Sequence, residues 1–174
     1  MKKKILLLFA MVLCLVGLTG CGSSSDNRET LSYKDEKLKL TTTFKYNKDD
    51  EFEFIKNVSG GKYAEIEFRN KKENLYFDMY YTEMSKTQTE TIKEDRSNQK
   101  YYKKYKFGDY DAYVYSQYES DLYLIIKLRE KDDVVTELFV SIELEEFDKD
   151  AVVFDIFNKD IINNFFNSIK TTEE

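Results

Sequence analysis

The chain contains no histidine, no proline and no tryptophan, and its only cysteines are Cys14 and Cys21. Histidine is the commonest general base and the commonest transition-metal ligand, so its absence removes most conventional catalytic and metal chemistry. After residue 21 the chain has no thiol for a disulfide, a cysteine zinc site or a nucleophile. The sequence therefore predicts a protein that is not an enzyme and that has no cofactor and no metal.

Residues 1–20 have the three parts of a secretion signal. Three lysines follow Met1 directly, and residues 5–18 are apolar apart from one glycine. This apolar run is about 14 residues long, whereas a helix that crosses the hydrocarbon core of a membrane needs about 20. The segment is therefore interpreted as a cleaved signal peptide and not as a membrane span.

The signal ends in the sequence Leu18, Thr19, Gly20 and Cys21. This pattern resembles the lipobox of bacterial lipoproteins, in which a branched apolar residue and two small residues precede a cysteine. The resemblance implies cleavage before Cys21, a diacylglyceryl thioether on its sulfur, and a lipid-anchored protein on the extracytoplasmic face of the cell membrane. Stable anchoring needs two such hydrophobic signals, which the two acyl chains supply. The alternative is an ordinary cleaved signal with a cysteine nearby.

The remaining chain is interpreted as a short tether followed by one domain. Residues 21–30 are rich in Ser, Asp and Asn, a composition typical of disordered spacers. Residues 31–174 have an ordinary length for a single domain and show no internal repeat. Without the three lysines of the signal, 24 basic and 33 acidic residues remain, a net charge of −9. This balance argues against a nucleic-acid partner, because nucleic-acid recognition needs a basic surface.

Alternation of apolar and polar residues predicts β-strands through most of the domain. A strand is expected within 37–46, and a hairpin within 64–81 that turns at 70–74. Further strands are expected at 103–107, 112–117, 122–129 and 134–144, the last two joined by a turn at 130–133. Because the connections are too short for crossovers, the strands are predicted to form a single antiparallel sheet.

The C-terminal segment changes to a helical period. Seven apolar residues fall on one stripe of a helix: Phe154, Phe157, Ile161, Ile162, Phe165, Phe166 and Ile169. This pattern predicts an amphipathic helix that lies across the sheet and contributes strongly to stability. The polar stretch 84–99 has few apolar residues and is interpreted either as an exposed helix or as a loop.

Three motifs of the domain are Thr-Phe-Lys-Tyr at 43–46, Phe-Gly-Asp-Tyr-Asp-Ala-Tyr at 107–113 and Phe-Phe-Asn-Ser-Ile at 165–169. Together they resemble small secreted proteins of the Mog1/PsbP-like fold. The resemblance implies an α+β fold in which a single antiparallel β-sheet is packed by helices on both faces, an α/β/α sandwich. It transfers no catalytic residue, because this fold serves unrelated binding roles.

Three other patterns are weaker indications of chemistry. The Ser-Gly-Gly-Lys segment at 59–62 lacks the first glycine and the final Ser or Thr of a phosphate-binding loop, so a turn is predicted there. The acidic run at 143–150 lacks the glycine and the spacing of a calcium loop. A carboxylate pair for polysaccharide hydrolysis stays open as the least favoured alternative, because the distance between two carboxylates depends on the fold.

The most unusual feature of the composition is its 14 tyrosines and 13 phenylalanines. Five tyrosines alternate away from the side assigned to the core, namely Tyr76, Tyr80, Tyr113, Tyr115 and Tyr123. If their face is open, it suits a protein or glycan partner, since tyrosine is enriched at recognition surfaces. If a helix covers the face, which is the favoured arrangement, these rings are core residues with hydroxyls at the rim.

The sequence therefore predicts a membrane-anchored extracytoplasmic lipoprotein that acts as a non-enzymatic binding or accessory module. Its partners are expected to be the membrane, through the lipid, and an envelope protein or glycan. Two alternatives remain: a structural accessory subunit of an envelope complex and, with less support, a carboxylate-based cell-wall hydrolase.

Overall fold

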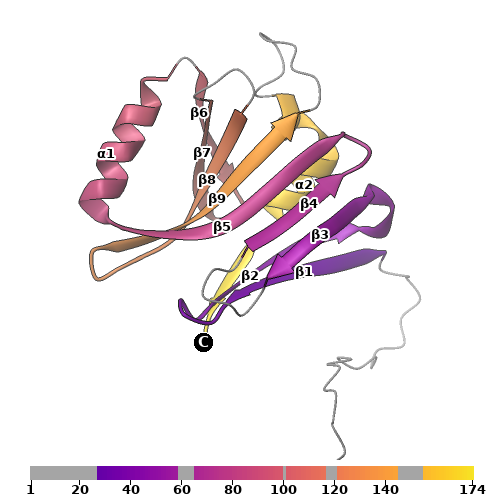
Figure 1. The fold of residues 1–174 in the computed structure, drawn as a ribbon, viewed down its shortest axis with the longest axis horizontal. Helices are drawn as coiled ribbons and strands as arrows, with labels where there is room; N and C mark the ends of the chain where they lie inside the picture. The colour runs from indigo at the N-terminus through magenta and orange to yellow at the C-terminus, as the bar shows by residue number, and fades with distance from the viewer. Residues whose placement is uncertain (1–26, 59–64, 100, 117–120, 145–154) are drawn as a thin grey trace, which may run out of the picture.

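The computed structural model describes residues 27–58, 65–99, 101–116, 121–144 and 155–174. In these ranges the chain forms ten strands in two antiparallel sheets, two α-helices and two short 3-10 helices (Figure 1). Among the described residues, no helix is long and apolar enough to cross a membrane.

The larger sheet has seven strands and contains both predicted hairpins. Its order is β3 (Phe52–Val58), β4 (Glu65–Asn70), β5 (Leu75–Ser85), β9 (Val134–Leu144), β8 (Asp121–Lys131), β7 (Tyr110–Ser116) and β6 (Tyr101–Phe107). Alternation is confirmed in β4 and β5, where Ile66, Phe68, Phe77 and Met79 are buried and their neighbours are less so. One face of this sheet therefore faces the main core.

The smaller sheet joins the two ends of the domain. It has the order β1 (Arg28–Asp35), β2 (Leu40–Asn47) and β10 (Lys170–Glu173). Strand β10 pairs with β2 so that Thr171 lies opposite Thr42, across most of the length of the chain. Strand β1 begins at Arg28, inside the range 21–30 that the sequence predicts as a tether.

The prediction of an α+β fold with a single sheet, the α/β/α sandwich, is wrong. Among the described residues the structure is mainly β, with ten strands and two α-helices. It has two sheets because the chain leaves β2 through the 3-10 helix η1 (Lys48–Asp50) and enters a different sheet at β3. Short connections determine that neighbouring strands run antiparallel, but they do not determine which sheet a strand joins. Strands β1, β3 and β10 are also absent from the predicted strands.

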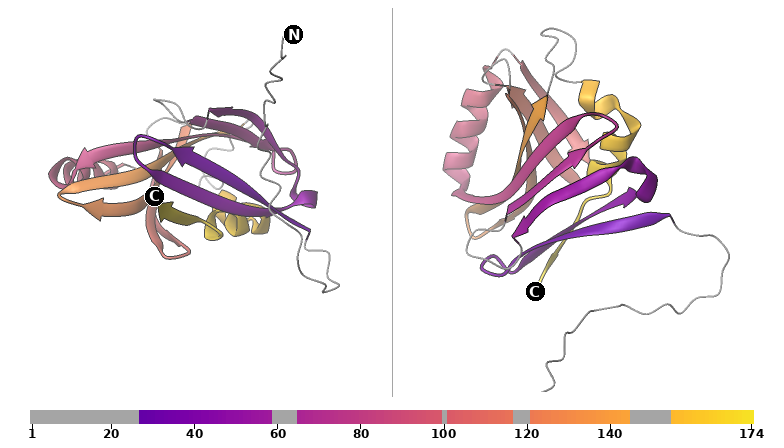
Figure 2. Two further views of the ribbon diagram at one scale, coloured as in Figure 1. Left: turned by 90° about the horizontal axis from the view of Figure 1, so that it is seen from below. Right: turned by 45° about the vertical axis from the view of Figure 1, so that its right-hand side comes forward.

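The two helices lie on opposite sides of the seven-stranded sheet (Figures 1 and 2). Helix α1 (Lys86–Ser97) confirms the helical interpretation of 84–99, and it begins at a capping box in which the Ser85 hydroxyl accepts a hydrogen bond from the Gln88 backbone N–H at 3.3 Å. Helix α2 (Asp160–Asn167) packs with the small sheet against the core face.

The C-terminal helix is shorter than the sequence predicts. The described segment starts with the 3-10 helix η2 (Asp155–Asn158), breaks at the extended residue Lys159, and continues as α2. The helix ends where the Ser168 hydroxyl accepts a hydrogen bond from the Lys45 backbone N–H at 2.6 Å and the chain passes into β10. Phe154, the first residue of the predicted stripe, lies outside the described residues.

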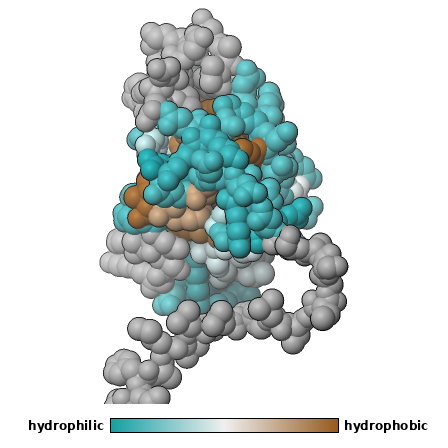
Figure 3. All heavy atoms as spheres, turned by 90° about the vertical axis from the view of Figure 1, so that its right-hand side faces the viewer, coloured by the Kyte–Doolittle hydropathy of each residue, from teal (hydrophilic) through white to brown (hydrophobic). Residues whose placement is uncertain are grey.

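The aromatic side chain of Phe165 lies at the centre of the main core. Its ring centroid is 4.8 Å from that of Phe44, 4.7 Å from that of Phe52 and 5.4 Å from that of Phe68. These partners come from both sheets, so α2 and the two sheets share one core. The surface on the right-hand side of Figure 1 is by contrast predominantly hydrophilic, with its hydrophobic residues confined to small areas (Figure 3).

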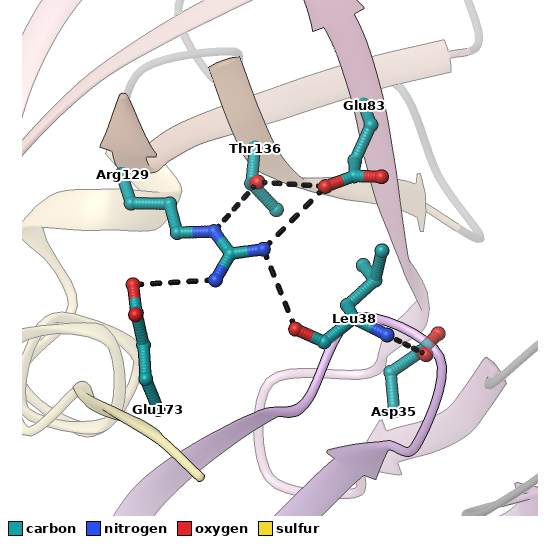
Figure 4. Close-up of polar contacts among 6 residues, drawn as sticks. All are labelled: Asp35, Leu38, Glu83, Arg129, Thr136 and Glu173. Carbon is teal, nitrogen blue, oxygen red and sulfur yellow. Dashed lines mark hydrogen bonds and ion pairs between the residues drawn. The ribbon is translucent and has the colours of Figure 1, made fainter. Parts of the chain in front are cut away.

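A polar cluster around Arg129 joins the two sheets (Figure 4). The guanidinium of Arg129 on β8 donates to the Thr136 hydroxyl at 3.0 Å and to the Leu38 carbonyl at 3.4 Å. It also forms ion pairs with Glu83 on β5 at 3.5 Å and with Glu173 on β10 at 3.2 Å. One half-buried side chain therefore connects the seven-stranded sheet to the β1–β2 turn and to the C-terminal strand.

Replacement of Arg129 with alanine is expected to lower the free energy of unfolding by about 1 to 3 kcal/mol, because several charge-assisted hydrogen bonds are lost together. Urea denaturation followed by circular dichroism measures this loss. The control is Arg69→Ala, which removes a more exposed ion pair with Glu53 and should cost clearly less stability than Arg129→Ala, because exposed ion pairs contribute little. Equal losses in the two variants would show that Arg129 has no special role in joining the sheets.

Candidate functional site

All five predicted tyrosines lie on the face of the seven-stranded sheet that points away from the main core. Their alternation follows the registers, which place Tyr80 opposite Phe139 and Tyr115 opposite Tyr123. Helix α1 lies over only part of this face, as Figure 1 shows. The tyrosine face therefore divides into a part covered by α1 and an open part.

The covered part is a cluster of Tyr102, Tyr113, Tyr115 and Ile125, which we call the covered cluster. Tyr113 and Tyr115 are only 5% and 6% exposed. Arg96 of α1 lies 4.7 Å from the ring centroid of Tyr115, and it donates a hydrogen bond to the Tyr113 hydroxyl at 2.7 Å. Helix α1 is largely polar, so it packs on these aromatic rings through the cation–π contact of Arg96 and not through an apolar stripe of its own.

Burial determines the acid–base behaviour of the covered cluster. Burial raises the pKa of Tyr113 to about 12, with Glu137 adding to the rise and Arg96 opposing it. Burial also raises the pKa of Tyr102, and within the described ranges its hydroxyl has no hydrogen-bond partner. These tyrosines therefore stay neutral and belong to a second, small core.

The open part, which we call the open surface, consists of Tyr76, Asp78, Tyr80, Tyr123 and Phe139. Tyr80 is 36% exposed and stacks on Phe139 with ring centroids 4.8 Å apart. Tyr123 lies 5.4 Å from Phe139 on the other side. Three aromatic rings from β5, β9 and β8 thus form a continuous partly exposed row.

Asp78 stands out on the open surface because one oxygen of its carboxylate is buried. In the part of the chain that the structure describes, this Oδ1 atom has no hydrogen-bond partner. Burial raises the pKa of Asp78, and the nearby carboxylates of Glu65 and Glu67 raise it further. Lys56 is the nearest compensating charge, but it forms ion pairs with Glu65 and with Glu67, the latter at 3.1 Å.

A shallow cavity of about 280 Å³ lies beside Asp78. Its lining includes Tyr76, Ser141, Glu143 and Ile55, whose side chain is 56% exposed. Glu143 forms no ion pair with any described residue. The open surface and this cavity therefore combine aromatic rings with uncompensated negative charge.

A second cavity, of about 360 Å³, lies under the first turns of α1. We call it the α1 cavity, and its lining includes Thr89 and Lys93 of α1, Lys104 of β6, Tyr113 of β7, Lys127 of β8 and Glu137 of β9. The lining mixes positive and negative side chains with two aromatic rings, those of Tyr105 and Tyr113. Among the described residues there is, however, no group of three or more acidic or cysteine side chains that could hold a metal ion.

The sequence does not single out Glu137. This residue lies in the predicted strand 134–144 on the side opposite the core, where an acidic residue is expected to meet solvent. It is instead 2% exposed, because α1 covers this part of the sheet. One feature of the sequence could have indicated that Glu137 is buried. It lies between the apolar residues Val135 and Leu138–Val140, a composition typical of strands buried on both faces.

Several predicted features lie outside the described residues. They are the signal motif Leu18, Thr19 and Gly20, the lipidation residue Cys21, the turn at 59–62 and most of the acidic run at 143–150.

The motifs that resemble the Mog1/PsbP-like fold lie in β2, in the β6–β7 hairpin and at the end of α2. Their arrangement in two sheets differs from the single sheet that the resemblance implies. Comparison of the chain with protein-family models, with curated proteins and with solved structures finds no match.

Proposed function

We propose that the protein is a lipid-anchored, non-enzymatic module of the extracytoplasmic membrane face that docks a lysine- or arginine-rich protein segment on its open surface. The observation that carries this proposal is the buried, unpartnered Oδ1 of Asp78 beside exposed aromatic rings. A cationic side chain docked beside the Asp78 carboxylate would supply the positive charge that Lys56 gives to Glu65 and Glu67 instead.

The aromatic row supports a protein partner. Tyrosine and phenylalanine anchor interfaces when they are buried by a partner, and their large area dominates the binding energy. Tyr80 and Phe139 stack on one another, so each ring already has one face occupied, which leaves less area for the flat stacking that a sugar ring requires. The carboxylates around Asp78 add electrostatic attraction for a basic segment.

The proposed anchor determines where such a partner must be. Six residues lie between Cys21 and Arg28, the first residue of β1. A fully extended chain of this length spans at most about 25 Å. The partner is therefore a protein at the membrane surface, which agrees with an accessory role beside an envelope complex.

Substitution of Asp78 with asparagine tests the docking surface. The probe is a synthetic lysine- and arginine-rich peptide whose binding is followed by fluorescence anisotropy. We expect wild-type protein to bind it and the variant to bind about 10 to 100 times more weakly, the loss expected for one charge-assisted hydrogen bond. The fold should be retained, because burial disfavours the charged form that the variant removes.

The matched control is Glu36→Gln, which removes one acidic charge from the exposed β1–β2 turn. This control should leave the affinity for the basic peptide within about twofold, since exposed charges contribute little. Equal weakening of binding by both variants would show that the peptide responds only to the net charge of the protein and not to Asp78. Preferential binding of envelope oligosaccharides over the peptide would contradict the proposal and favour a glycan partner.

A further inference from the structure

We infer that the α1 cavity is a binding site for a small zwitterion, a molecule of the α-amino acid class that carries a primary ammonium group and a carboxylate. This site lies under α1, apart from the open surface, and the inference does not depend on the proposed docking function. Its volume of about 360 Å³ falls in the lower part of the range of small-molecule sites.

The first argument is the state of Glu137. Its side chain is 2% exposed and lines the cavity. Within the described residues, its carboxylate has no hydrogen bond and no ion pair. Buried carboxylates are normally satisfied by donors, because an unpaired buried charge is costly. An ammonium group has three N–H donors and a positive charge, so it fits this requirement.

The cations near Glu137 are directed to other partners. Lys127 forms an ion pair with Glu130 at 2.6 Å, and Arg96 donates to the Tyr113 hydroxyl at 2.7 Å. Lys93 lies over the ring of Tyr113, 5.9 Å from its centroid. These charges oppose the rise in the pKa of Glu137 that burial causes, but none of them donates to its carboxylate. The position next to Glu137 is therefore open to a donor from a ligand.

The second argument is the positive charge of the cavity lining that no ion pair uses. Lys104 on β6 lines the cavity and forms no ion pair with a described residue. Lys93 on α1 also lines it, with only the ring contact to Tyr113. By contrast, Lys86 and Lys127 are both bound to Glu130, at 2.8 and 2.6 Å. Lys93 and Lys104 are thus the groups that can bind a ligand carboxylate.

The charge arrangement selects the ligand class. A simple anion would meet the lysines but also the buried carboxylate, and a simple amine would satisfy Glu137 but leave the lysines unused. A zwitterion satisfies both ends at once. The ring of Tyr113 and the methyl group of Thr89 offer apolar contacts for the side chain of such a ligand.

The test is isothermal titration calorimetry of the lipidated protein in detergent with a panel of free α-amino acids and dipeptides. Matched ligands that carry only an amine or only a carboxylate serve as controls. We expect at least one zwitterion to bind ten times or more tightly than the matched single-charge ligands. Preference for dipeptides over free amino acids would identify peptide termini as the source of the zwitterion. No zwitterion binding, or equal binding of the single-charge ligands, would overturn the inference.

Two substitutions locate the site. Glu137→Gln and Lys104→Met should each weaken zwitterion binding at least tenfold, and Lys104 is exposed, so its replacement keeps the fold. Glu143→Gln, in the cavity beside Asp78, should leave zwitterion binding unchanged. Unchanged zwitterion binding in both cavity variants would overturn the assignment. Binding of the basic peptide should survive Glu137→Gln, which separates a failure of this inference from a failure of the docking proposal.

Discussion

Replacement of Phe165 with alanine is expected to lower the free energy of unfolding by about 3 to 5 kcal/mol. The ring is 1% exposed and packs against Phe44, Phe52 and Phe68. Its removal leaves a cavity where α2 meets both sheets, and rigid aromatic neighbours from different elements cannot close it without moving whole strands. For a domain of this size the expected fall in melting temperature is about 10 °C.

Chemical denaturation followed by tyrosine fluorescence or circular dichroism gives the free energy directly. Asn164→Ala, on the exposed side of the same helix, is the control and should change stability by less than about 0.5 kcal/mol. A loss below about 1 kcal/mol for Phe165→Ala would show that α2 is not a main part of the core.

Substitution of Cys21 with alanine is expected to abolish metabolic labelling of the protein with palmitate. The proposed anchor is a thioether on the Cys21 sulfur, and alanine offers no atom to carry it. Without acyl chains the protein should be lost from the membrane fraction, because stable anchoring needs two hydrophobic signals.

Cys14→Ala is the matched control, since residue 14 lies in the apolar run of the proposed signal. This variant should keep its label and its membrane location. Continued labelling of the Cys21→Ala protein would mean that the lipobox interpretation is wrong and that the signal is an ordinary cleaved one.

The open surface and the α1 cavity share one physical feature, a carboxylate whose pKa burial raises. Asp78 and Glu137 both lie on the face of the sheet away from the main core, at different distances from α1. In each case the folded protein keeps an acidic side chain at a cavity, and no described donor reaches the buried Oδ1 of Asp78 or the carboxylate of the 2% exposed Glu137. Such a group reduces stability, so its presence at a cavity is most simply explained by a ligand that supplies the donor.

Local periodicity predicts the strands well where one face of a strand is buried. The alternation of Leu40, Thr42 and Phe44 in β2 and of Ile66 and Phe68 in β4 is found as expected. The prediction from alternation misses β1, β3 and β10, because these strands contain few apolar residues or carry bulky residues on both faces. The bulge between Phe54 and Lys56 in β3, for example, interrupts the alternation that a sequence pattern needs.

Part of the tyrosine face could be predicted and part could not. The period of two places Tyr76, Tyr80, Tyr113, Tyr115 and Tyr123 on one face, and the registers agree. Whether that face is open depends on α1, which has few apolar residues to indicate where it packs. Arg96 contacts the ring of Tyr115 in the covered cluster by a cation–π interaction. The spacing of apolar residues does not indicate such a contact, so it could not predict where α1 packs.

The sequence by itself determined which chemistry is missing, through the absence of histidine and of any thiol after residue 21, and it determined most strands through their alternation. Only the tertiary structure decided that β10 joins β2, that α1 divides the tyrosine face, and that Glu137 lines the α1 cavity. The reason is that composition and periodicity are properties of neighbouring residues, whereas these three features arise from contacts between segments far apart in the chain.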